Sequence, residues 1–306
     1  MRVVFFGTPE FAVPSLEALL GEGFDVVAVV TQPDKPQGRS RSTAVPPPVK
    51  TAAAAEDVPV LQPERPSDPA FIERLRALAP DVGVVVAYGH ILRRDLLALP
   101  RLGMINLHPS LLPELRGAAP VEWAILNGLQ RTGVTIMRMD EGLDSGPILL
   151  QIPHDIDPEA TGGELSEHLS EMGAQALVEA LALFETGLEP HPQEQARATY
   201  APKLTRETAH IRWADPAERV ARLIRALDPR PGAWTELDGR EVKLFGARLV
   251  EDRGAPGEIR TTGDGLRIAT GQGAVQVGEV QPAGKARMAA AEWLRGRGAQ
   301  AGKRFG

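Results

Sequence analysis

Short apolar runs alternate with amphipathic stretches along the first 188 residues of the chain. Residues 1–7 (MRVVFFG) and 24–31 (FDVVAVVT) contain few polar side chains, which is typical of parallel strands buried on both faces. The stretch between them places apolar side chains on one helical face before two glycines end it. These side chains are Phe11, Leu16, Leu19 and Leu20. The start of the chain is therefore expected to form a unit of strand, helix and strand.

The same alternation continues to residue 188. Further elements are expected at residues 68–80 (helix), 81–89 (strand), 103–108 (strand), 120–127 (helix), 132–140 (strand) and 163–185 (helix). Strands that alternate with helices predict a Rossmann-like α/β domain with a mostly parallel sheet. Such sheets bind ligands beyond the C-terminal ends of their strands. Two strand ends carry polar residues, Asn106 with His108 and Tyr88 with Gly89, and these are candidates for a binding site.

The pattern changes after Leu188. Residues 189–205 are polar and contain three prolines, which predicts a linker. A helix is expected at residues 215–227, and short strands separated by glycines follow it, which suggests a small OB-like β-barrel. The sequence therefore predicts a first domain at residues 1–188, a linker at 189–205 and a second domain at 206–306.

Residues 31–50 (TQPDKPQGRSRSTAVPPPVK) show no hydrophobic periodicity. They are rich in proline and include four basic residues, so we expect an irregular surface loop. Loops of this length inside a compact domain are usually functional or disordered.

Charge is distributed unevenly around the net value of -6. Residues 1–202 carry 15 Lys and Arg against 27 Asp and Glu, whereas residues 203–306 carry 19 against 13. The first part therefore has a net charge of -12 and the second a net charge of +6. A basic C-terminal third fits a region that contacts a polyanion. The alternative is a chance surface composition.

Composition narrows the class of protein. The 306 residues are 43% hydrophobic and 24% charged, as in a globular protein of about two domains. No apolar run reaches the ~18 residues that span a bilayer, and the N-terminus has no signal-peptide pattern. We therefore expect a cytoplasmic protein. The absence of cysteine excludes disulfides, thiolate nucleophiles and cysteine-based metal sites.

Two common kinds of site are not indicated. The first strand-to-helix turn, FFGTPEF, lacks the G-x-G-x-x-G pattern of dinucleotide sites, since it contains only Gly7. The six histidines show no spacing typical of a metal site.

Asn106 and His108 are two residues apart at the end of an expected strand, so their side chains point to the same side. An amide and an imidazole placed in this way can polarise one carbonyl group and stabilise a tetrahedral oxyanion. The alternative is a strand end in which both side chains bond to the local backbone.

Asp144 lies in a glycine-flanked loop, DEGLDSG, after another expected strand. If that strand neighbours the strand of Asn106, the carboxylate can reach His108, orient it and help to move a proton. The alternative is that Asp144 only forms an Asx-turn.

Several motifs resemble those of the folate-dependent formyltransferases. The segments NLHPSLLP, RGAAP and MDEGLDSGPI carry this resemblance. The segments FGTPEFAVPSL, TQPDKPQGR, VVVAYGHIL, TGVTIMRMDEGLDSG and QPAGKARM resemble, more narrowly, the branch that acts on methionyl-initiator tRNA. The similarity runs from residue 2 to about residue 295, with the motifs in family order.

The resemblance implies a reaction and a catalytic set. The reaction is transfer of the formyl group of 10-formyltetrahydrofolate to the α-amino group of methionyl-initiator tRNA, in translation initiation. Asn106 and His108 would stabilise the oxyanion, and Asp144 would orient His108 and help to take a proton from the attacking amine. The family requires no metal and no tightly bound cofactor.

The resemblance also implies two binding regions. The folate site would be lined by Ser110, Leu111, Leu112 and Pro113, with the pterin held by the backbone of Val86, Ala87 and Tyr88.

The loop at residues 34–50 matches a family insertion thought to enter the acceptor arm of the tRNA. Arg39 keeps its basic position, and Arg41 and Lys50 would add phosphate contacts, although RSTAV stands where the family often has more lysine. The basic C-terminal domain would supply further RNA contacts, and we expect a monomer.

Two alternatives remain open at this point. One is another folate-dependent formyltransferase, such as glycinamide ribonucleotide formyltransferase, although that enzyme resembles a single domain of about 200 residues. The other is a non-catalytic RNA-binding protein on the same scaffold. The presence of Asn106, His108 and Asp144 together argues against the second.

Overall fold

The computed structural model describes residues 1–37, 43–262, 265–296 and 298–306, and these residues form two compact units. The first unit consists of Met1–Gly117, Thr132–His154 and Ser166–Tyr200. The second consists of Ala118–Arg131, Asp155–Leu165 and Ala201–Gly306. The units interleave along the chain, whereas the sequence pattern predicts contiguous domains on either side of residues 189–205.

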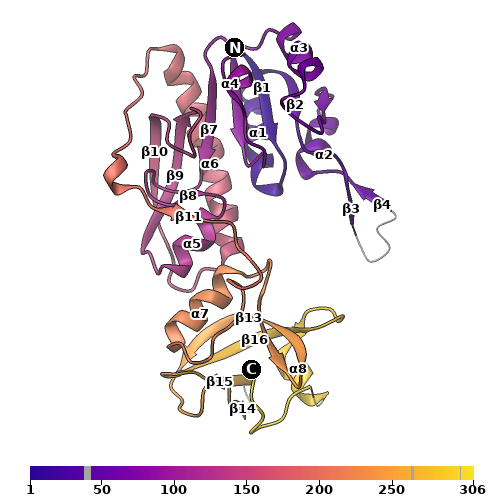
Figure 1. Ribbon diagram of the computed structural model, residues 1–306, viewed down its shortest axis with the longest axis vertical. Helices are drawn as coiled ribbons and strands as arrows, with labels where there is room; N and C mark the ends of the chain where they lie inside the picture. The colour runs from indigo at the N-terminus through magenta and orange to yellow at the C-terminus, as the bar shows by residue number, and fades with distance from the viewer. Residues whose placement is uncertain (38–42, 263–264, 297) are drawn as a thin grey trace. The chain divides into compact units, whose positions relative to one another are not determined.

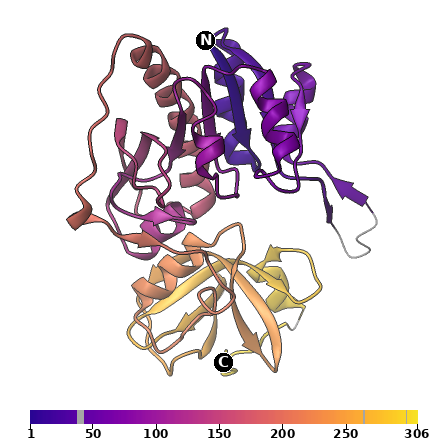
Figure 2. The ribbon, with the colours of Figure 1, turned by 45° about the horizontal axis from the view of Figure 1, so that its top comes forward.

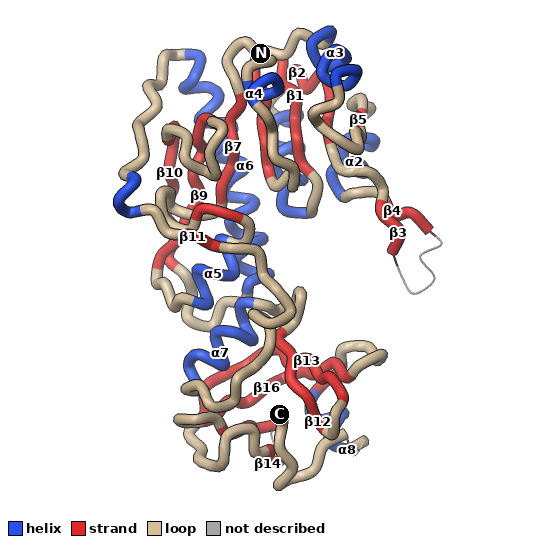
Figure 3. The backbone as a smooth tube through the Cα atoms, viewed as in Figure 1, coloured by secondary structure: helices blue, strands red, loops and turns tan. Residues whose placement is uncertain are grey.

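The first unit is built on a seven-stranded sheet, seen as red bands in Figure 3. In spatial order its strands are β10 (Ile148–Asp155), β9 (Arg131–Arg138), β7 (Met104–His108), β6 (Val82–Val86), β1 (Arg2–Gly7), β2 (Asp25–Val30) and β5 (Val60–Leu61). The pairs from β7 to β5 are parallel, and β9 runs antiparallel to β7. The Rossmann-like, mostly parallel sheet expected from the sequence is therefore confirmed.

Helices flank this sheet (Figure 1). They are α1 (Val13–Gly21), α2 (Pro48–Ala55), α3 (Pro69–Ala77), α4 (Arg94–Leu97) and α6 (Gly162–Glu185), with short 3-10 turns at Glu10–Ala12 and Gln195–Arg197. Phe5 and Phe6 point to opposite faces of β1, and both are fully buried. Because both faces are covered, the strands need apolar side chains at every position, which explains their apolar runs.

Helix α6 packs closely on β7. A Cβ atom at Gly173 would lie 2.6 Å from Cδ1 of Leu107, so only glycine permits this approach without a shift. Ser170, one turn earlier, donates a hydrogen bond from Oγ to the carbonyl of Phe11 at 2.8 Å. The side chain of Leu107 therefore faces α6, and those of Asn106 and His108 face the opposite side of the sheet.

The segment expected as an irregular loop, residues 31–50, contains regular structure, so that prediction was wrong in part. Strands β3 (Lys35–Gln37) and β4 (Thr43–Val45) pair in antiparallel register, and they extend away from the sheet in Figure 1. Helix α2 begins at Pro48. Each strand has three residues and no apolar alternation, which is why sequence periodicity missed them. Residues 38–42, which include Arg39 and Arg41, lie outside the described residues.

The second unit contains a curled antiparallel sheet (Figure 2). Its elements are α5 (Pro120–Leu126), α7 (Ala217–Ala226), β12 (Ala233–Leu237), β13 (Arg240–Val250), β14 (Ile259–Thr262), β15 (Gly265–Ala269), β16 (Ala274–Pro282), β17 (Met288–Ala289) and α8 (Ala290–Arg295). The strand order is β12, β13, β16, β15, β14, and β17 also pairs with β16. The sheet has the half-barrel form expected of a small OB-like domain. Two further short strands in the chain are β8 (Arg116–Gly117) and β11 (Tyr200–Ala201).

Part of the QPAGKARM motif stabilises the second unit. Arg287 donates to Oδ1 of Asp228 at 2.7 Å, and its guanidinium lies 4.0 Å from the ring centre of Phe245. Asp228 is buried, and its other oxygen accepts from the backbone N–H of Gly246 at 3.1 Å. Arg287 therefore compensates a buried carboxylate.

Candidate active site

Strand β7 ends with two polar side chains inside an apolar sheet. Asn106 is 9% exposed and His108 is 4% exposed. They lie opposite Met137 and Thr135 of β9, and Asn106 also pairs with Val85 of β6. Among the described residues, no hydrogen bond engages the side-chain amide of Asn106. Its N–H groups are therefore available to a ligand.

The imidazole of His108 is oriented by the backbone. Its Nε2 lies 3.0 Å from the carbonyl oxygen of Leu115. A carbonyl oxygen only accepts hydrogen bonds, so Nε2 must carry the proton. In the neutral ring Nδ1 is then the unprotonated nitrogen, and it lies 3.8 Å from Oδ2 of Asp144. This distance is too long for a hydrogen bond, but it is short enough for the carboxylate to attract the ring when the ring is protonated.

Asp144 approaches His108 from a loop that folds back on itself. Because β9 is antiparallel to β7, Arg138 lies opposite Ile105, and the loop leaves the sheet near the beginning of β7. The loop then returns, so that the N–H of Arg138 donates to the carbonyl of Pro147 at 2.9 Å. Asp144 has a φ of 48°, and its Oδ2 accepts from the N–H of Gly117 at 2.8 Å. The carboxylate is thereby held beside the imidazole.

The segment expected to line the folate site is mostly buried. Ser110 is 1% exposed, and its hydroxyl donates to the carbonyl of Glu114 at 2.6 Å. The N–H of Leu112 donates to Oγ1 of Thr135 at 3.1 Å, and its carbonyl accepts from Gln151 at 2.9 Å. Pro113 is buried, whereas Leu111 is only partly buried. Leu111 is therefore the member of this set with a side chain most accessible to a ligand.

The end of β6 presents backbone rather than side chains. Val86 is fully buried and pairs with Leu107, and the exposed Ala87 has a φ of 47°. The carbonyl of Tyr88 already accepts two hydrogen bonds at 3.0 Å, from Oγ1 of Thr8 and Nε2 of Gln32. Of these three residues, Ala87 is the one that is exposed.

The phenol of Tyr88 belongs to the core. Its ring is 1% exposed and contacts that of Phe6 edge to face, with centroids 5.4 Å apart. Burial raises the pKa of Tyr88 to about 12. The side chain is thus a neutral packing element beneath the strand end.

Lys50, a predicted RNA contact, is engaged within the protein. Its ammonium group donates to both carboxylate oxygens of Asp34 at 2.8 Å, and Gln62 donates to the same carboxylate at 2.7 Å. The hydrogen bonds from Gln62 and from Lys50 lower the pKa of Asp34, so this carboxylate is charged at neutral pH. Asp34 therefore offsets much of the charge that Lys50 would offer to a phosphate.

The residues that hold His108 and Asp144 in place were not predicted from the sequence. The contacts from Leu115 and Gly117 are made by backbone atoms, which no side-chain pattern reveals. Arg116 and Gln193 are polar residues that were assigned to a motif and to a linker, yet both are buried. Their contacts are long-range, so nothing in the local sequence indicated them.

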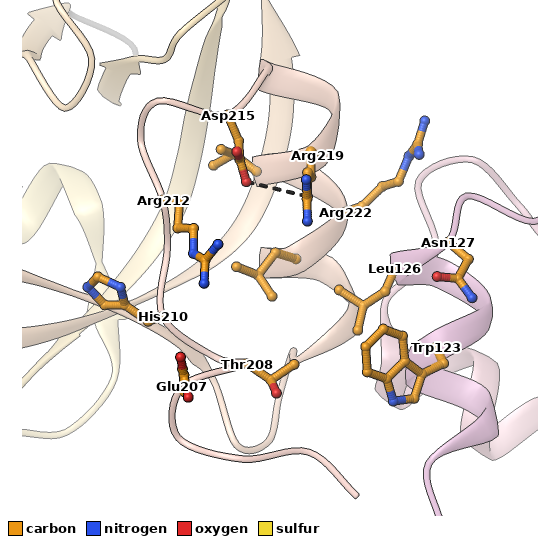
Figure 4. Close-up of a pocket in the computed structure, with 12 residues that line it drawn as sticks. Trp123, Leu126, Asn127, Glu207, Thr208, His210, Arg212, Asp215, Arg219 and Arg222 are labelled. Atoms are coloured by element: carbon orange, nitrogen blue, oxygen red, sulfur yellow. Dashed lines mark ion pairs between the residues drawn. The ribbon is translucent and has the colours of Figure 1, made fainter. Parts of the chain in front are cut away.

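A hollow in the second unit is rich in arginine (Figure 4). It is lined by Trp123 and Leu126 of α5, Arg219 and Arg222 of α7, and the segment that includes His210 and Arg212. Asp215 pairs with Arg219 at 3.3 Å. Within the described residues, no carboxylate lies at ion-pair distance from Arg212 or Arg222. The hollow therefore presents two uncompensated cationic groups beside an indole ring.

Metal-binding clusters and membrane-spanning helices are both missing from the parts of the chain that the structure describes. No group of three or more His, Asp or Glu side chains is arranged to hold a metal ion there. No helix among those residues combines the length and the apolar character needed to cross a bilayer.

Solved structures show which fold this is. HypX from Aquifex aeolicus, in complex with tetrahydrofolic acid, superimposes with a TM-score of 0.68 at 21% identity, over 96% of this chain and 47% of HypX. This chain thus spans about half the length of HypX. WlaRD, a sugar 3N-formyl transferase, gives a TM-score of 0.67 at 17% identity, over 94% of this chain and 99% of WlaRD.

Sequence relatives are similar along their full length. A methionyl-tRNA formyltransferase from Roseiflexus sp. (strain RS-1) is 50% identical over 311 residues, which cover 100% of this chain and 95% of that protein. A protein of the same name from Syntrophus aciditrophicus (strain SB) is 48% identical over 300 residues, which cover 97% of this chain and 96% of that protein. The sequence pattern described as Formyl transferase matches residues 1–181, and that described as Formyl transferase, C-terminal domain, matches residues 203–298. The chain therefore belongs to the formyl transferase family.

Proposed function

We propose that the protein transfers the formyl group of 10-formyltetrahydrofolate to the α-amino group of methionyl-initiator tRNA. The observation that carries this proposal is the 50% identity, over the whole chain, to a protein named methionyl-tRNA formyltransferase. The grouping of Asn106, His108 and Asp144 supports it, because the reaction needs an oxyanion donor and a route for one proton.

The reaction itself defines what the site must do. The amine attacks the formyl carbon, the C–N10 bond of the folate breaks, and one proton moves from the amine to N10. A tetrahedral intermediate with a negatively charged oxygen lies between these steps. The side-chain amide of Asn106, which has no partner among the described residues, is the proposed donor to that oxygen. A well-placed donor of this kind contributes about 3 kcal/mol to the transition state.

His108 is the proposed carrier of the proton. Since its Nε2 is committed to the carbonyl of Leu115, the unprotonated Nδ1 accepts the proton that the attacking amine loses. The charged ring then donates from Nδ1 to the oxyanion and passes the proton to N10. The carboxylate of Asp144, 3.8 Å away, stabilises the positive charge for as long as the imidazole is protonated. Asp144 also keeps the ring in place from its own anchor on Gly117.

Substrate contacts follow from the same proposal. Leu111 and Ala87 are the accessible members of the proposed folate set, while Ser110, Leu112 and Pro113 shape its wall from within the protein. For the tRNA, Arg39 and Arg41 lie outside the described residues and stay predictions. Lys50 is proposed to fix the base of their loop through Asp34 in addition to any phosphate contact.

The domain organisation and setting complete the proposal. Residues 1–188 would form the catalytic domain, 189–205 the connection and 206–306 the RNA-binding domain, in a cytoplasmic monomer. The uncompensated Arg212 and Arg222 support an RNA contact in the second unit.

The test is formyl transfer by the purified protein. With 10-formyltetrahydrofolate and methionyl-initiator tRNA, we expect formylmethionyl-tRNA, detected by mass spectrometry after release of the amino acid. Glycinamide ribonucleotide replaces the tRNA in a parallel reaction, because it is the acceptor of the related single-domain enzyme. Absence of product with the tRNA, or faster transfer to the ribonucleotide, would contradict the proposal.

A further inference from the structure

Residues 115–117 contact both ionisable members of the proposed catalytic set. The carbonyl of Leu115 accepts from Nε2 of His108 at 3.0 Å, and the N–H of Gly117 donates to Oδ2 of Asp144 at 2.8 Å. Arg116 lies between these two contacts in the chain. Whatever fixes this tripeptide therefore fixes the spacing of His108 and Asp144.

Arg116 is a buried cation that is satisfied by neutral groups. It is 3% exposed, and its Nε and Nη2 donate to Oε1 of Gln193 at 3.1 and 2.6 Å. Its Nη1 donates to Oε1 of Gln195 at 2.8 Å. In the described parts of the chain, no carboxylate lies within ion-pair distance of this guanidinium. Burial of a guanidinium costs free energy unless its N–H donors are satisfied. The Oε1 acceptor of Gln193 is therefore needed to keep Arg116 buried.

The other end of the Gln193 side chain holds the loop of Asp144. Its Nε2 donates to the carbonyl of Asp144 at 2.9 Å and to the carbonyl of Gly146 at 2.7 Å, and it lies 3.9 Å from the sulfur of Met137. Oε1 faces only donors and Nε2 faces only acceptors. An amide rotated by half a turn would place Oε1 against the two carbonyl oxygens and Nε2 against the guanidinium N–H groups, so the orientation is fixed. One neutral side chain thus joins the Asp144 loop to the Arg116 tripeptide.

Neighbouring residues attach the same stretch, residues 193–199, which we call the site strap. Oγ1 of Thr199 accepts from the N–H of Leu115 at 2.8 Å, and its carbonyl accepts from the N–H of Arg116 at 2.9 Å. The N–H of Thr199 donates to the carbonyl of Pro113 at 3.3 Å. Gln193 is the only residue of the strap that is buried; the other six are exposed or partly exposed. The strap therefore borders the site, and Gln193 is the strap residue that is buried in the protein.

We propose that Gln193 is a positioning residue for formyl transfer, which acts by setting the distance between the Asp144 carboxylate and the His108 imidazole. This inference rests on the proposed function, because it assumes that these two groups move the proton. Displacement of a catalytic group by about 1 Å can lower the rate about 100-fold. A side chain that ties one group directly and the other through Arg116 is suited to prevent such a displacement.

The decisive variant is Gln193→Glu. Glutamate keeps an acceptor for Arg116, and it replaces the amide N–H groups by an oxygen that repels the carbonyls of Asp144 and Gly146. We expect kcat to fall about tenfold or more, with KM for both substrates within about twofold of the parent value. The thermal midpoint should fall less than in Gln193→Met, because Arg116 remains paired in Gln193→Glu.

Gln193→Met and Gln195→Met complete the experiment. Methionine has the length of glutamine but makes neither set of hydrogen bonds, so Gln193→Met should lower kcat at least as much as Gln193→Glu. Gln195 also accepts a hydrogen bond from Arg116 but makes no contact with the Asp144 loop, so Gln195→Met is the matched comparison and should lower kcat by clearly less than Gln193→Met. If Gln193→Met does not fold, Gln193→Glu alone decides.

Parent-like kcat in Gln193→Glu would overturn the inference, and so would an equal loss of kcat in Gln195→Met and Gln193→Met. A proportional rise in KM would also overturn it, since it would indicate general loss of structure. The proposed function is judged separately, by the activity of the parent protein and its loss in Asp144→Ala. An active parent, an inactive Asp144→Ala and a fully active Gln193→Glu would leave the function standing and reject the positioning role.

Discussion

The end of β7 and the site strap both help to form the site of His108 and Asp144, but they contribute in different ways. β7 supplies Asn106 and His108, polar groups at the end of an apolar strand, and this contrast is visible in the sequence. The strap supplies no reacting group, only hydrogen bonds from Gln193, Gln195 and Thr199. Its composition is that of an exposed connection. Candidate reactive groups can therefore be identified from the local sequence, whereas the contacts that position them cannot.

The largest expected effect tests the strand end and its partner loop. Asn106→Ala and Asp144→Ala should each lower kcat about 100-fold or more, because each removes a group that acts on the oxyanion or the proton. Steady-state kinetics and circular dichroism would measure this. Asp95→Ala, which removes an exposed carboxylate from α4, is the control. Near-parent turnover in either site variant would remove that residue from the mechanism.

A smaller effect is expected in the strap. Thr199→Val keeps the shape of the side chain but leaves the N–H of Leu115 without its acceptor, at a cost of about 1 kcal/mol or more in unfolding free energy. Because Leu115 orients His108, kcat should also fall several-fold. Urea unfolding and kinetics check both expectations. Thr186→Val, just after the end of α6, removes an exposed hydroxyl outside the strap and is the control. An equal loss of kcat in that variant would show that the effect of Thr199→Val is not specific to the strap.

The hairpin of β3 and β4 extends the comparison to RNA binding. Arg39→Gln should raise KM for the tRNA and lower the slope of log KM against log salt by about one, if Arg39 contacts a phosphate. Lys50→Gln should change the slope less, because Asp34 already offsets its charge. Kinetics over a range of potassium chloride concentrations would compare them. Equal slopes in the two variants would contradict the distinction.

The smallest effect concerns Tyr88, at the neighbouring strand end. Its pKa is raised from 10.0 to about 12, so the unfolded chain loses this proton first as the pH rises. The unfolding free energy should therefore be independent of this group below pH 10.0 and fall as the pH rises toward about 12. Urea unfolding at several alkaline pH values measures the slope. Tyr88→Phe should remove it and Tyr200→Phe should not; a slope that survives in Tyr88→Phe would assign it to another group.

Much of the fold could be predicted because its signals are local. The apolar runs of β1, β2 and β6 reflect burial on both faces, and the periodic helix at α6 spans 24 residues. The hairpin of β3 and β4 was missed because three residues per strand carry no period. The direction of β9 was also not predictable, since a buried strand has the same apolar sequence pattern whether it pairs in parallel or antiparallel.

The candidate site divides in the same way. Asn106, His108 and Asp144 could be named from the sequence, because polar residues after apolar strands and the family motifs mark them. Their order along the chain did not indicate that Asp144 would arrive from a loop that doubles back past the beginning of β7. Nor did it indicate that Lys50 would be paired with Asp34, since that contact joins a residue just before β3 to a residue of α2.

From the sequence alone one obtains the alternation of strands and helices, the types of reactive side chain and the family. These depend on hydrophobic periodicity and on residue identity, which are properties of short stretches. The tertiary structure decided that the imidazole of His108 faces Asp144 through Nδ1, because the carbonyl of Leu115 occupies Nε2. It also decided that Gln193 is buried beneath the Asp144 loop. The hydrogen bonds of Gln193 to Arg116, Asp144 and Gly146 join residues 47 to 77 positions apart, and only the folded chain brings them within hydrogen-bonding distance.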